Sequence, residues 1–257
     1  MGVFKKKYRP DTETQVNGAR LVTFVEPKHA ISEQFRTLRT NIEFAGAALD
    51  KLQVVMFTSA EMSDGKTTVS SNVAVTWAQA GKSVLYVDAD LRRPTAHSTF
   101  DLLNTRGLTT ILASNAQPKD TVQKTFVDNL EVLTSGPVPP NPAELLSSAR
   151  MAAVVDWMRN NYDVVVFDVP PVMAVTDAQV LMPLVDGAIL VAIFGKTLKV
   201  NLQRTVETLS LTDTKILGVV ERVRDGKNDA GYGYGYGYGY GYGYGYGYGN
   251  DSQKENV

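Results

Sequence analysis

The sequence predicts an α/β fold in which a doubly wound, mostly parallel sheet is flanked by helices. Between residues 29 and 228, short apolar runs rich in β-branched residues alternate with longer segments of helical pattern. Short runs that are apolar throughout are typical of parallel strands buried on both faces, and their alternation with helices is typical of a doubly wound sheet. Gly-rich or acidic segments follow three of these runs. Because ligands in such folds bind beyond the carboxyl ends of the strands, we expect a ligand site at that edge.

The elements are expected in a regular order along the chain. Strands are predicted at Val54–Thr58, Val84–Asp88, Leu130–Leu133, Val164–Asp168, Ala188–Ile193 and Ile216–Val220. Helices are predicted near residues 67–80, 142–161, 176–182 and 198–211. A further helix, with Ser32 expected as its N-cap, is indicated by the i, i+4, i+7, i+11 spacing of Ile31, Phe35, Leu38 and Ile42.

Composition divides the 257 residues into three parts. We expect a flexible basic N-terminal segment at residues 1–28, an α/β domain at residues 29–228 and a Gly-Tyr-rich, low-complexity tail at residues 229–257. The absence of Cys excludes disulfides, and a formal net charge of −1 gives no general attraction to nucleic acid. The longest apolar run, Ala188 to Phe194, is far shorter than the ~20 residues that cross a bilayer, so a cytoplasmic protein is expected.

The segment after the first predicted strand has the pattern of a phosphate-binding loop. It reads A-E-M-S-D-G-K-T over residues 60–67, which fits G-x-x-x-x-G-K-[ST] with Ala in the first position. Lys66 is expected to reach the β- and γ-phosphates, and the Thr67 hydroxyl to ligate Mg²⁺. A strand–turn–helix junction with a surface lysine is the alternative, but the strand before it and the helix after it favour a P-loop NTPase-like site. The expected nucleotide-binding residues are Ser63, Asp64, Gly65, Lys66, Thr67 and Thr68.

Two other predicted strands end in carboxylates. Asp168 follows the strand V-V-V-F in the position of a Walker B aspartate, which holds Mg²⁺ directly or through water. Asp88 and Asp90 are two residues apart, so on an extended strand they share one face. One of them could ligate Mg²⁺ while the other accepts the proton of the attacking hydroxyl; we assign the base role to Asp88 and a supporting role to Asp90. Each aspartate alone would also suit a helix N-cap or a turn.

These motifs resemble those of the bacterial tyrosine kinases of exopolysaccharide and capsule synthesis. The phosphate loop, the segment V-L-Y-V-D-A-D-L-R-R-P and the segment V-V-V-F-D-V-P-P resemble the family's Walker A, Walker A′ and Walker B sequences. The segment G-P-V-P-P-N-P-A-E-L-L over residues 136–146 is also similar, and the resemblance covers about residues 24–225. It implies Lys66, Asp88 and Asp90 as catalytic positions, Thr67, Asp88 and Asp168 as metal positions, and ATP with Mg²⁺ as the bound nucleotide.

The same resemblance implies partners. Glu33, Arg36 and Arg39 match the E-x-x-R-x-x-R motif that the family associates with ring-like self-assembly, although a solvated charged helix face would look the same. Members that lack a spanning segment are activated by a transmembrane partner, a chain-length-determinant protein, which would recruit this chain to the inner face of the cell membrane. A cognate tyrosine phosphatase is a further expected partner, and nucleic acid is not.

The tail is the expected substrate. Its tyrosines alternate with Gly, which is typical of a mobile segment that could enter the active site of a neighbouring subunit. A tail that merely adheres to itself or to a surface is the alternative. The expected phosphorylation sites are Tyr232, Tyr234, Tyr236, Tyr238, Tyr240, Tyr242, Tyr244, Tyr246 and Tyr248.

Two other functions compete with an autophosphorylating tyrosine kinase. A partition- or division-type ATPase switch would use water as the acceptor, but such ATPases carry a lysine near the start of the loop, where this chain has Glu61. A non-catalytic scaffold would only bind nucleotide, and the full set of acidic residues argues against it. One departure concerns the base of the nucleotide, because Glu221 and Arg222 stand where relatives often place an Asn near the adenine.

Overall fold

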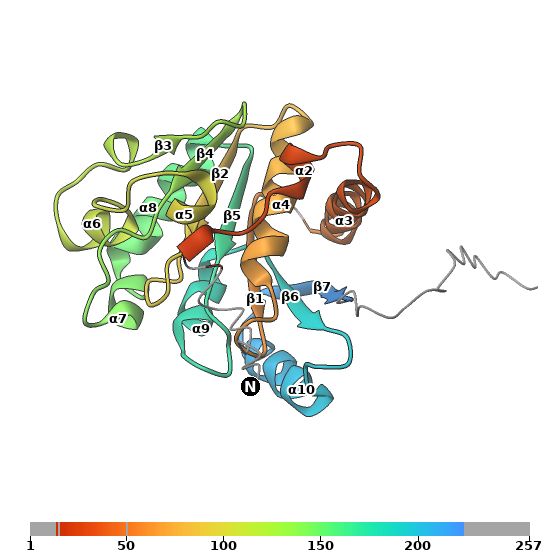
Figure 1. Cartoon of the computed structure of the whole chain (residues 1–257). Coiled ribbons are helices and arrows are strands. Elements are labelled where there is room, and N and C mark those ends of the chain that lie inside the picture. Colours follow the sequence, from red (N-terminus) through yellow and green to blue (C-terminus); the bar gives the residue numbers. More distant parts are fainter. Residues whose placement is uncertain (1–13, 15, 50, 224–257) are drawn as a thin grey trace, which may run out of the picture. The chain divides into compact units, whose positions relative to one another are not determined.

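The computed structural model describes residue 14, residues 16–49 and residues 51–223. Its centre is a seven-stranded sheet with the order β3-β4-β2-β5-β1-β6-β7 (Figure 1). Neighbouring strands are parallel except β3 and β4, which are antiparallel. The strands are β1 Val54–Ser59, β2 Val84–Asp88, β3 Gln123–Lys124, β4 Leu130–Leu133, β5 Val164–Asp168, β6 Gly187–Ile193 and β7 Lys215–Arg222.

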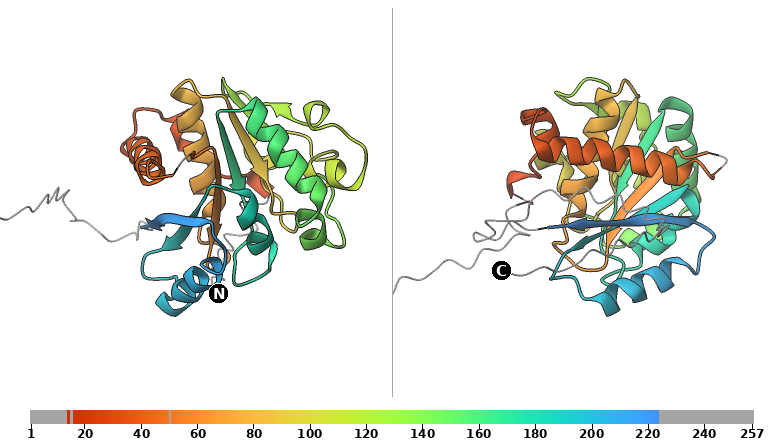
Figure 2. Two further views of the ribbon diagram at one scale, coloured as in Figure 1. Left: turned by 180° about the vertical axis from the view of Figure 1, so that it is seen from behind. Right: turned by 90° about the vertical axis from the view of Figure 1, so that its right-hand side faces the viewer.

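Helices cover both faces of this sheet. One face carries α2 (Val22–Val25), α3 (Ala30–Gly46), α4 (Lys66–Gln79) and α5 (Ala96–Phe100). The other carries α6 (Leu108–Ala113), α7 (Pro142–Leu146), α8 (Ala149–Asn161), α9 (Asp177–Leu181) and α10 (Lys199–Leu209). Figure 1 shows α4 in front of the sheet, and the view from behind in Figure 2 shows α8 in front. Short 3₁₀ turns lie at Pro118–Asp120 and Met182–Leu184.

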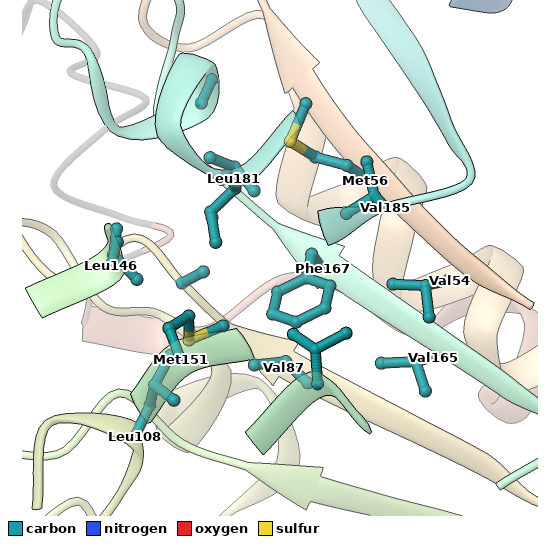
Figure 3. Packing of buried hydrophobic residues seen from close by; sticks show 14 of the residues in the cluster. Val54, Met56, Val87, Leu108, Leu146, Met151, Val165, Phe167, Leu181 and Val185 are labelled. Atoms are coloured by element: carbon teal, nitrogen blue, oxygen red, sulfur yellow. The ribbon is translucent and has the colours of Figure 1, made fainter. Parts of the chain in front are cut away.

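The alternation of side chains along each strand produces two hydrophobic clusters. Val54 and Met56 of β1 and Phe167 of β5 pack with Met151 of α8 on one face, as Figure 3 shows. The strand residues that alternate with these, such as Val55 of β1 and Val166 of β5, belong to the cluster on the α4 face. Because the three central strands are buried on both faces, they read as uninterrupted apolar runs.

The structure confirms the predicted α/β class and places every predicted strand within two residues of its predicted ends. The expected helix at 142–161 is two helices. Ser147 is the C-cap of α7 and Ser148 the N-cap of α8, and the Ser148 side chain accepts a hydrogen bond from Met151 N. The prediction that Ser32 caps the first long helix was wrong. His29 is the N-cap, and the buried Ser32 Oγ instead donates to Val22 O and Glu26 O at 3.1 and 2.7 Å.

The segment before residue 29 takes part in the core. Ala19, Leu21 and Val22 are buried, and Thr23 N donates to Asn72 Oδ1 of α4 at 3.0 Å. The packed region therefore begins earlier than the domain boundary expected near residue 28. The expected phosphorylation sites lie outside the described residues. Within the described ranges, no helix is both long and apolar enough to cross a membrane.

Candidate active site

The phosphate loop joins β1 to α4 through two residues with left-handed backbone. Ser63 and Gly65 have φ values of 64° and 88°, and α4 begins at Lys66. Such a loop turns successive N–H groups inward, and the helix start adds its unpaired N–H groups. The left-handed φ of Gly65 favours glycine there, and a Cβ would also displace the end of the Arg222 side chain, whose Nη1 it would approach to 1.6 Å. The local backbone is thus shaped to bind an anion.

Lys66 is held between two carboxylates from different strands. Its Nζ lies 3.0 Å from Asp90 Oδ2 and 3.5 Å from Asp168 Oδ1, and the side chain is 13% exposed. Burial alone would lower the pKa of Lys66, but the charges of Asp168 and Asp90 outweigh it and raise the pKa. The ammonium therefore remains charged at neutral pH, and Lys66 lines the pocket over the phosphate loop.

Asp88 and Asp168 lie side by side because β2 and β5 are in parallel register with these two residues paired. Both are fully buried. Burial, followed by the charge of Asp168, raises the pKa of Asp88 to about 7. Burial also raises the pKa of Asp168, with Lys66 opposing it. The edge of the sheet therefore concentrates negative charge that a bound cation would relieve.

Access differs between the two aspartates of the Walker A′ segment. Asp88 Oδ2 accepts from the backbone N–H of Thr95 and Ala96 at 2.9 and 2.8 Å, and Asp88 Oδ1 accepts from Asp90 N at 3.3 Å. Asp90 lines the pocket, whereas Asp88 does not. Asp88 thus holds the turn after β2, and Asp90 presents its carboxylate to the pocket.

Thr67 and Asp168 form the part of the site that suits a metal ion. Thr67 Oγ1 donates to Asp168 Oδ2 at 2.6 Å, which brings a hydroxyl and a carboxylate together beside Lys66. Among the described residues, no three His, Cys, Asp or Glu side chains converge as a complete metal cage. Mg²⁺ fits such a partial set, because it prefers hard oxygen ligands and usually keeps waters and substrate phosphates as its others.

A pocket of about 340 Å³ lies over the phosphate loop. The predicted residues that line it are Ser63, Gly65, Lys66, Thr67, Thr68 and Asp90. The Asp64 side chain is turned away instead: it is fully buried, accepts from Thr197 Oγ1 at 3.1 Å and lies 3.8 Å from Lys196 Nζ. Only the backbone of Asp64 is therefore placed to contact phosphate.

Several lining residues were missed or left open by the sequence analysis. Arg222, at the end of β7, donates to Asp64 O at 3.3 Å and lines the pocket with Thr14. Arg92, in the Walker A′ segment, lines the pocket and makes a bidentate pair with the buried Asp177, both distances being 3.0 Å. None of these contacts could be predicted from a local sequence motif, because each depends on which distant segment packs against the phosphate loop.

The E-x-x-R-x-x-R motif divides into two parts on α3. Glu33 and Arg36 pair at 2.6 Å on the outside of the helix, where Glu33 is 71% exposed. Arg36 also donates to Pro27 O. Arg39 points inward, and its Nη1 donates to Thr76 O of α4 at 2.8 Å.

The strand order, the loop and the carboxylates define a nucleotide-binding protein of the P-loop class. In agreement, residues 53–210 match the family model described as AAA domain. The chain is 47% identical to the tyrosine-protein kinase YwqD of Bacillus subtilis (strain 168) over 78% of its own length and 84% of that protein. It is 39% identical to the putative tyrosine-protein kinase CapB of Staphylococcus aureus, over 80% and 91% respectively.

Solved structures agree with these relatives. The kinase domain of the Escherichia coli tyrosine kinase ETK has a TM-score of 0.77 at 32% identity, covering 90% of this chain and 89% of that domain. The chimerical protein CapA2B2 has a TM-score of 0.75 at 37% identity, covering 83% and 98%. The Pyrococcus horikoshii septum site-determining protein MinD, at 22% identity and a TM-score of 0.57, shares the fold. The chain therefore belongs to the bacterial tyrosine kinases and is a protein-tyrosine kinase rather than a division-type ATPase.

Proposed function

We propose that the pocket binds ATP with Mg²⁺ and that the chain transfers the γ-phosphoryl group to tyrosines of its own C-terminal tail. The observation that carries this proposal is the placement of Lys66 between Asp90 and Asp168, with the Thr67 hydroxyl on Asp168. One charged donor for phosphate oxygens and one hydroxyl–carboxylate pair for a metal thus lie together. A bound Mg²⁺ would neutralise charge on the β- and γ-phosphates.

The protein's own groups then act mainly by positioning and charge stabilisation. The loop N–H groups and Lys66 hold the phosphates. The acceptor hydroxyl oxygen forms a bond to the γ-phosphorus while the bond from that phosphorus to the bridging oxygen breaks, leaving ADP with the electron pair. The hydroxyl proton passes to a carboxylate of the Walker A′ segment.

Geometry favours Asp90 as that carboxylate, although the sequence analysis gave the base role to Asp88. A general base must lie within hydrogen-bond reach of the proton it accepts. Asp90 lines the pocket, whereas both oxygens of the buried Asp88 accept backbone N–H groups. A pKa near 7 would suit Asp88 for the role, but its contacts assign it to holding the turn in which Asp90 lies.

The proposed substrate is the run of nine tyrosines from Tyr232 to Tyr248. A flexible Gly-rich chain of nineteen residues, the length from Gly231 to Gly249, would span roughly 24 Å on average and at most about 65 Å when extended. Such a reach suits transfer in trans within an oligomer. Each phosphotyrosine adds about −1.5 to −2 charge, so nine would add roughly −14 to −18. Charge repulsion of this size should dissociate the oligomer, which light scattering before and after phosphorylation would test.

The names of the relatives support a proposal for the cellular setting. We infer that the kinase assembles into a ring through Glu33 and Arg36, is recruited to the inner face of the membrane by a transmembrane chain-length-determinant protein and regulates exopolysaccharide or capsule synthesis. The likeness to CapB and to CapA2B2 supports this setting. A cognate tyrosine phosphatase would reset the tail.

Phosphosite mass spectrometry tests the proposal. The full chain would be incubated with Mg²⁺, ATP and the cytoplasmic part of the cognate activator, beside Lys66→Met and the matched control Lys82→Met. Lys82 is an exposed lysine near the amino ends of the strands. We expect phosphate on the tail in the wild type and in Lys82→Met but not in Lys66→Met. ATP hydrolysis with no phosphotyrosine would instead support the ATPase switch.

A further inference from the structure

Tyr86 is a buried polar residue that the mechanism does not yet use. The described residues include two tyrosines, and of these Tyr86 is fully buried, whereas Tyr162 is partly exposed. Tyr86 lies on β2 two residues before Asp88, and the register pairs Tyr86 with Val166 and Asp88 with Asp168. Since side chains two apart on a strand share a face, Tyr86 lies on the same side of the sheet as both carboxylates.

The hydroxyl of Tyr86 connects the sheet to the first turn of α4. Its Oη lies 2.9 Å from Ser70 Oγ, and Ser70 is fully buried. Ser70 Oγ also donates to Thr67 O at 3.2 Å. Either hydroxyl can be the donor in the Tyr86–Ser70 pair, and the Tyr86 hydroxyl also hydrogen-bonds with the Asp168 side chain. Thr67 in turn donates its Oγ1 to Asp168 Oδ2, so a line of hydrogen bonds runs from β2 through α4 to β5.

Packing does not explain why a tyrosine occupies this position. The centroid of its ring lies 5.4 Å from that of Phe100, within a cluster of aliphatic and aromatic side chains. A phenylalanine at this position would make the same ring contacts. A buried hydroxyl is costly unless it is hydrogen-bonded, so it needs a reason beyond volume. Burial, and then the charge of Asp168, raises the pKa of Tyr86, so the group stays protonated as a donor.

We propose that the Tyr86 hydroxyl is a positioning group for the metal end of the nucleotide. Through Ser70 it holds the first turn of α4 against β2, and so keeps Thr67 Oγ1 beside Asp168 in the arrangement that suits Mg²⁺. Tyr86 itself does not line the pocket. This inference rests on the proposed use of Thr67 and Asp168 at the metal. It assigns a positioning role to a residue outside the Walker motifs' usual ligands.

Nucleotide binding to Tyr86→Phe tests the role without relying on activity. The affinity of the full chain for ADP would be measured calorimetrically with Mg²⁺ and again with EDTA. We expect the Kd with Mg²⁺ to rise about 3- to 10-fold and the Kd in EDTA to stay unchanged, because the loss of one hydrogen bond falls on the metal pair alone. An unchanged Mg²⁺ effect, or an equal loss in both conditions, would overturn the proposal.

Tyr162→Phe is the matched control. It removes a hydroxyl that donates to Glu131 Oε2 at 2.6 Å, and its ring contacts Trp157 rather than the phosphate loop. Its ADP affinity should match the wild type with and without Mg²⁺. A Mg²⁺-specific loss in Tyr162→Phe as large as that in Tyr86→Phe would refute a local role for Tyr86.

Ser70→Ala tests the route. It should reproduce at least part of the Mg²⁺-specific loss, and the double variant with Tyr86→Phe should lose no more than Tyr86→Phe alone, since removal of the Tyr86 hydroxyl already breaks its contact with Ser70. Additive losses would overturn the route through Ser70. If Tyr86→Phe did not fold, a wild-type Mg²⁺ effect in Ser70→Ala would by itself refute the inference. A wild-type protein whose ADP affinity ignores Mg²⁺ would refute the metal site, and the role of Tyr86 with it.

Discussion

The two ends of the central sheet hold their acidic side chains in opposite ways. At the carboxyl end, Asp88, Asp90 and Asp168 gather around the ammonium of Lys66, and burial raises the pKa of Asp88 to about 7. At the amino end, Asp186 accepts two hydrogen bonds from Arg159 at 2.9 and 2.7 Å. It also accepts from the backbone N–H of Gln53 and Val54 at 2.8 and 2.7 Å.

The pKa values show what this difference means. Burial alone would raise the pKa of Asp186, but Arg159 and the two N–H donors outweigh it and lower the pKa. The carboxylate at the amino end is therefore stabilised in its charged form, whereas at the carboxyl end burial raises the pKa of Asp88 and of Asp168. Three carboxylates around one lysine leave a formal excess of two negative charges when all are ionised. Such an excess costs stability and suits a site that binds a divalent cation.

The largest expected effect comes from neutralising a carboxylate at the carboxyl end. Asp168→Asn should lower the rate of tyrosine phosphorylation by about 10² to 10³-fold, as loss of a preorganised charge-stabilising group does elsewhere. Its carboxamide oxygen can still accept from Thr67 Oγ1, and one unfavourable buried charge is removed. The midpoint of urea unfolding without ligand should therefore stay or rise. Single-turnover kinetics and urea titration would check this, and a clear drop in the midpoint would contradict the comparison.

The next largest effect is expected at the amino end and has the opposite character. Asp186→Asn should lower the free energy of unfolding at pH 7 by about 1–3 kcal/mol, because hydrogen bonds to a charged group are lost. Phosphorylation per folded molecule should not change, since Asp186 lies far from the phosphate loop along β6. The folded pKa is lowered, so this stabilisation is present above the unfolded pKa near 4 and is lost as the pH falls through the folded pKa. A destabilisation that did not shrink on acidification would refute the assignment.

The sequence predicted the carboxyl end more fully than the amino end. The strand followed by A-x-x-x-x-G-K-T and the two strands that end in Asp are local patterns. The sequence alone therefore predicted that Lys66, Thr67, Asp90 and Asp168 lie close together. Asp186 precedes β6 and Arg159 lies on α8, 27 residues earlier. Their pairing depends on how α8 packs across the sheet, which no local spacing encodes.

The same limit applies within the active site. The role of Asp88 in holding the turn depends on backbone N–H groups seven and eight residues later, and the contact of Arg222 with the loop spans 158 residues. Long-range contacts of this kind follow from tertiary packing. Buried strands, in contrast, follow from composition, and for that reason three of them were placed at their observed ends.

A pH series sharpens the comparison with a smaller effect. The folded pKa of Asp88 is raised, so its contribution to stability is fully present below the unfolded pKa near 4 and is lost as the pH rises through about 7. A bound cation offsets this loss. The stabilisation by Mg²⁺ and ADP should therefore be about 1 kcal/mol larger at pH 8 than at pH 6. Urea unfolding with and without ligand would measure it, and Asp168→Asn should flatten the difference because it removes the charge beside Asp88.

The smallest effect on stability is expected for an acidic residue in water, which supplies the baseline for both ends of the sheet. Glu33 is 71% exposed and pairs with Arg36 across one turn of α3. Glu33→Ala should change the free energy of unfolding by about 0.3 kcal/mol, since exposed pairs contribute little. If the residue serves assembly, light scattering should show a lower mass for this variant with an unchanged urea midpoint.

Arg39→Ala provides the contrast on the same helix. Arg39 is 20% exposed on its side chain and donates to Thr76 O at 2.8 Å, so its loss should destabilise the packing of α3 on α4 more than Arg36→Ala does. The three residues would then have two different roles: Glu33 and Arg36 face outward, whereas Arg39 holds α3 against α4. Equal destabilisation by Arg36→Ala and Arg39→Ala would refute this division.

Glu33→Ala and Asp186→Asn can also be compared directly. If both variants lowered the free energy of unfolding by the same amount, burial and hydrogen bonding would not be what distinguishes these two carboxylates.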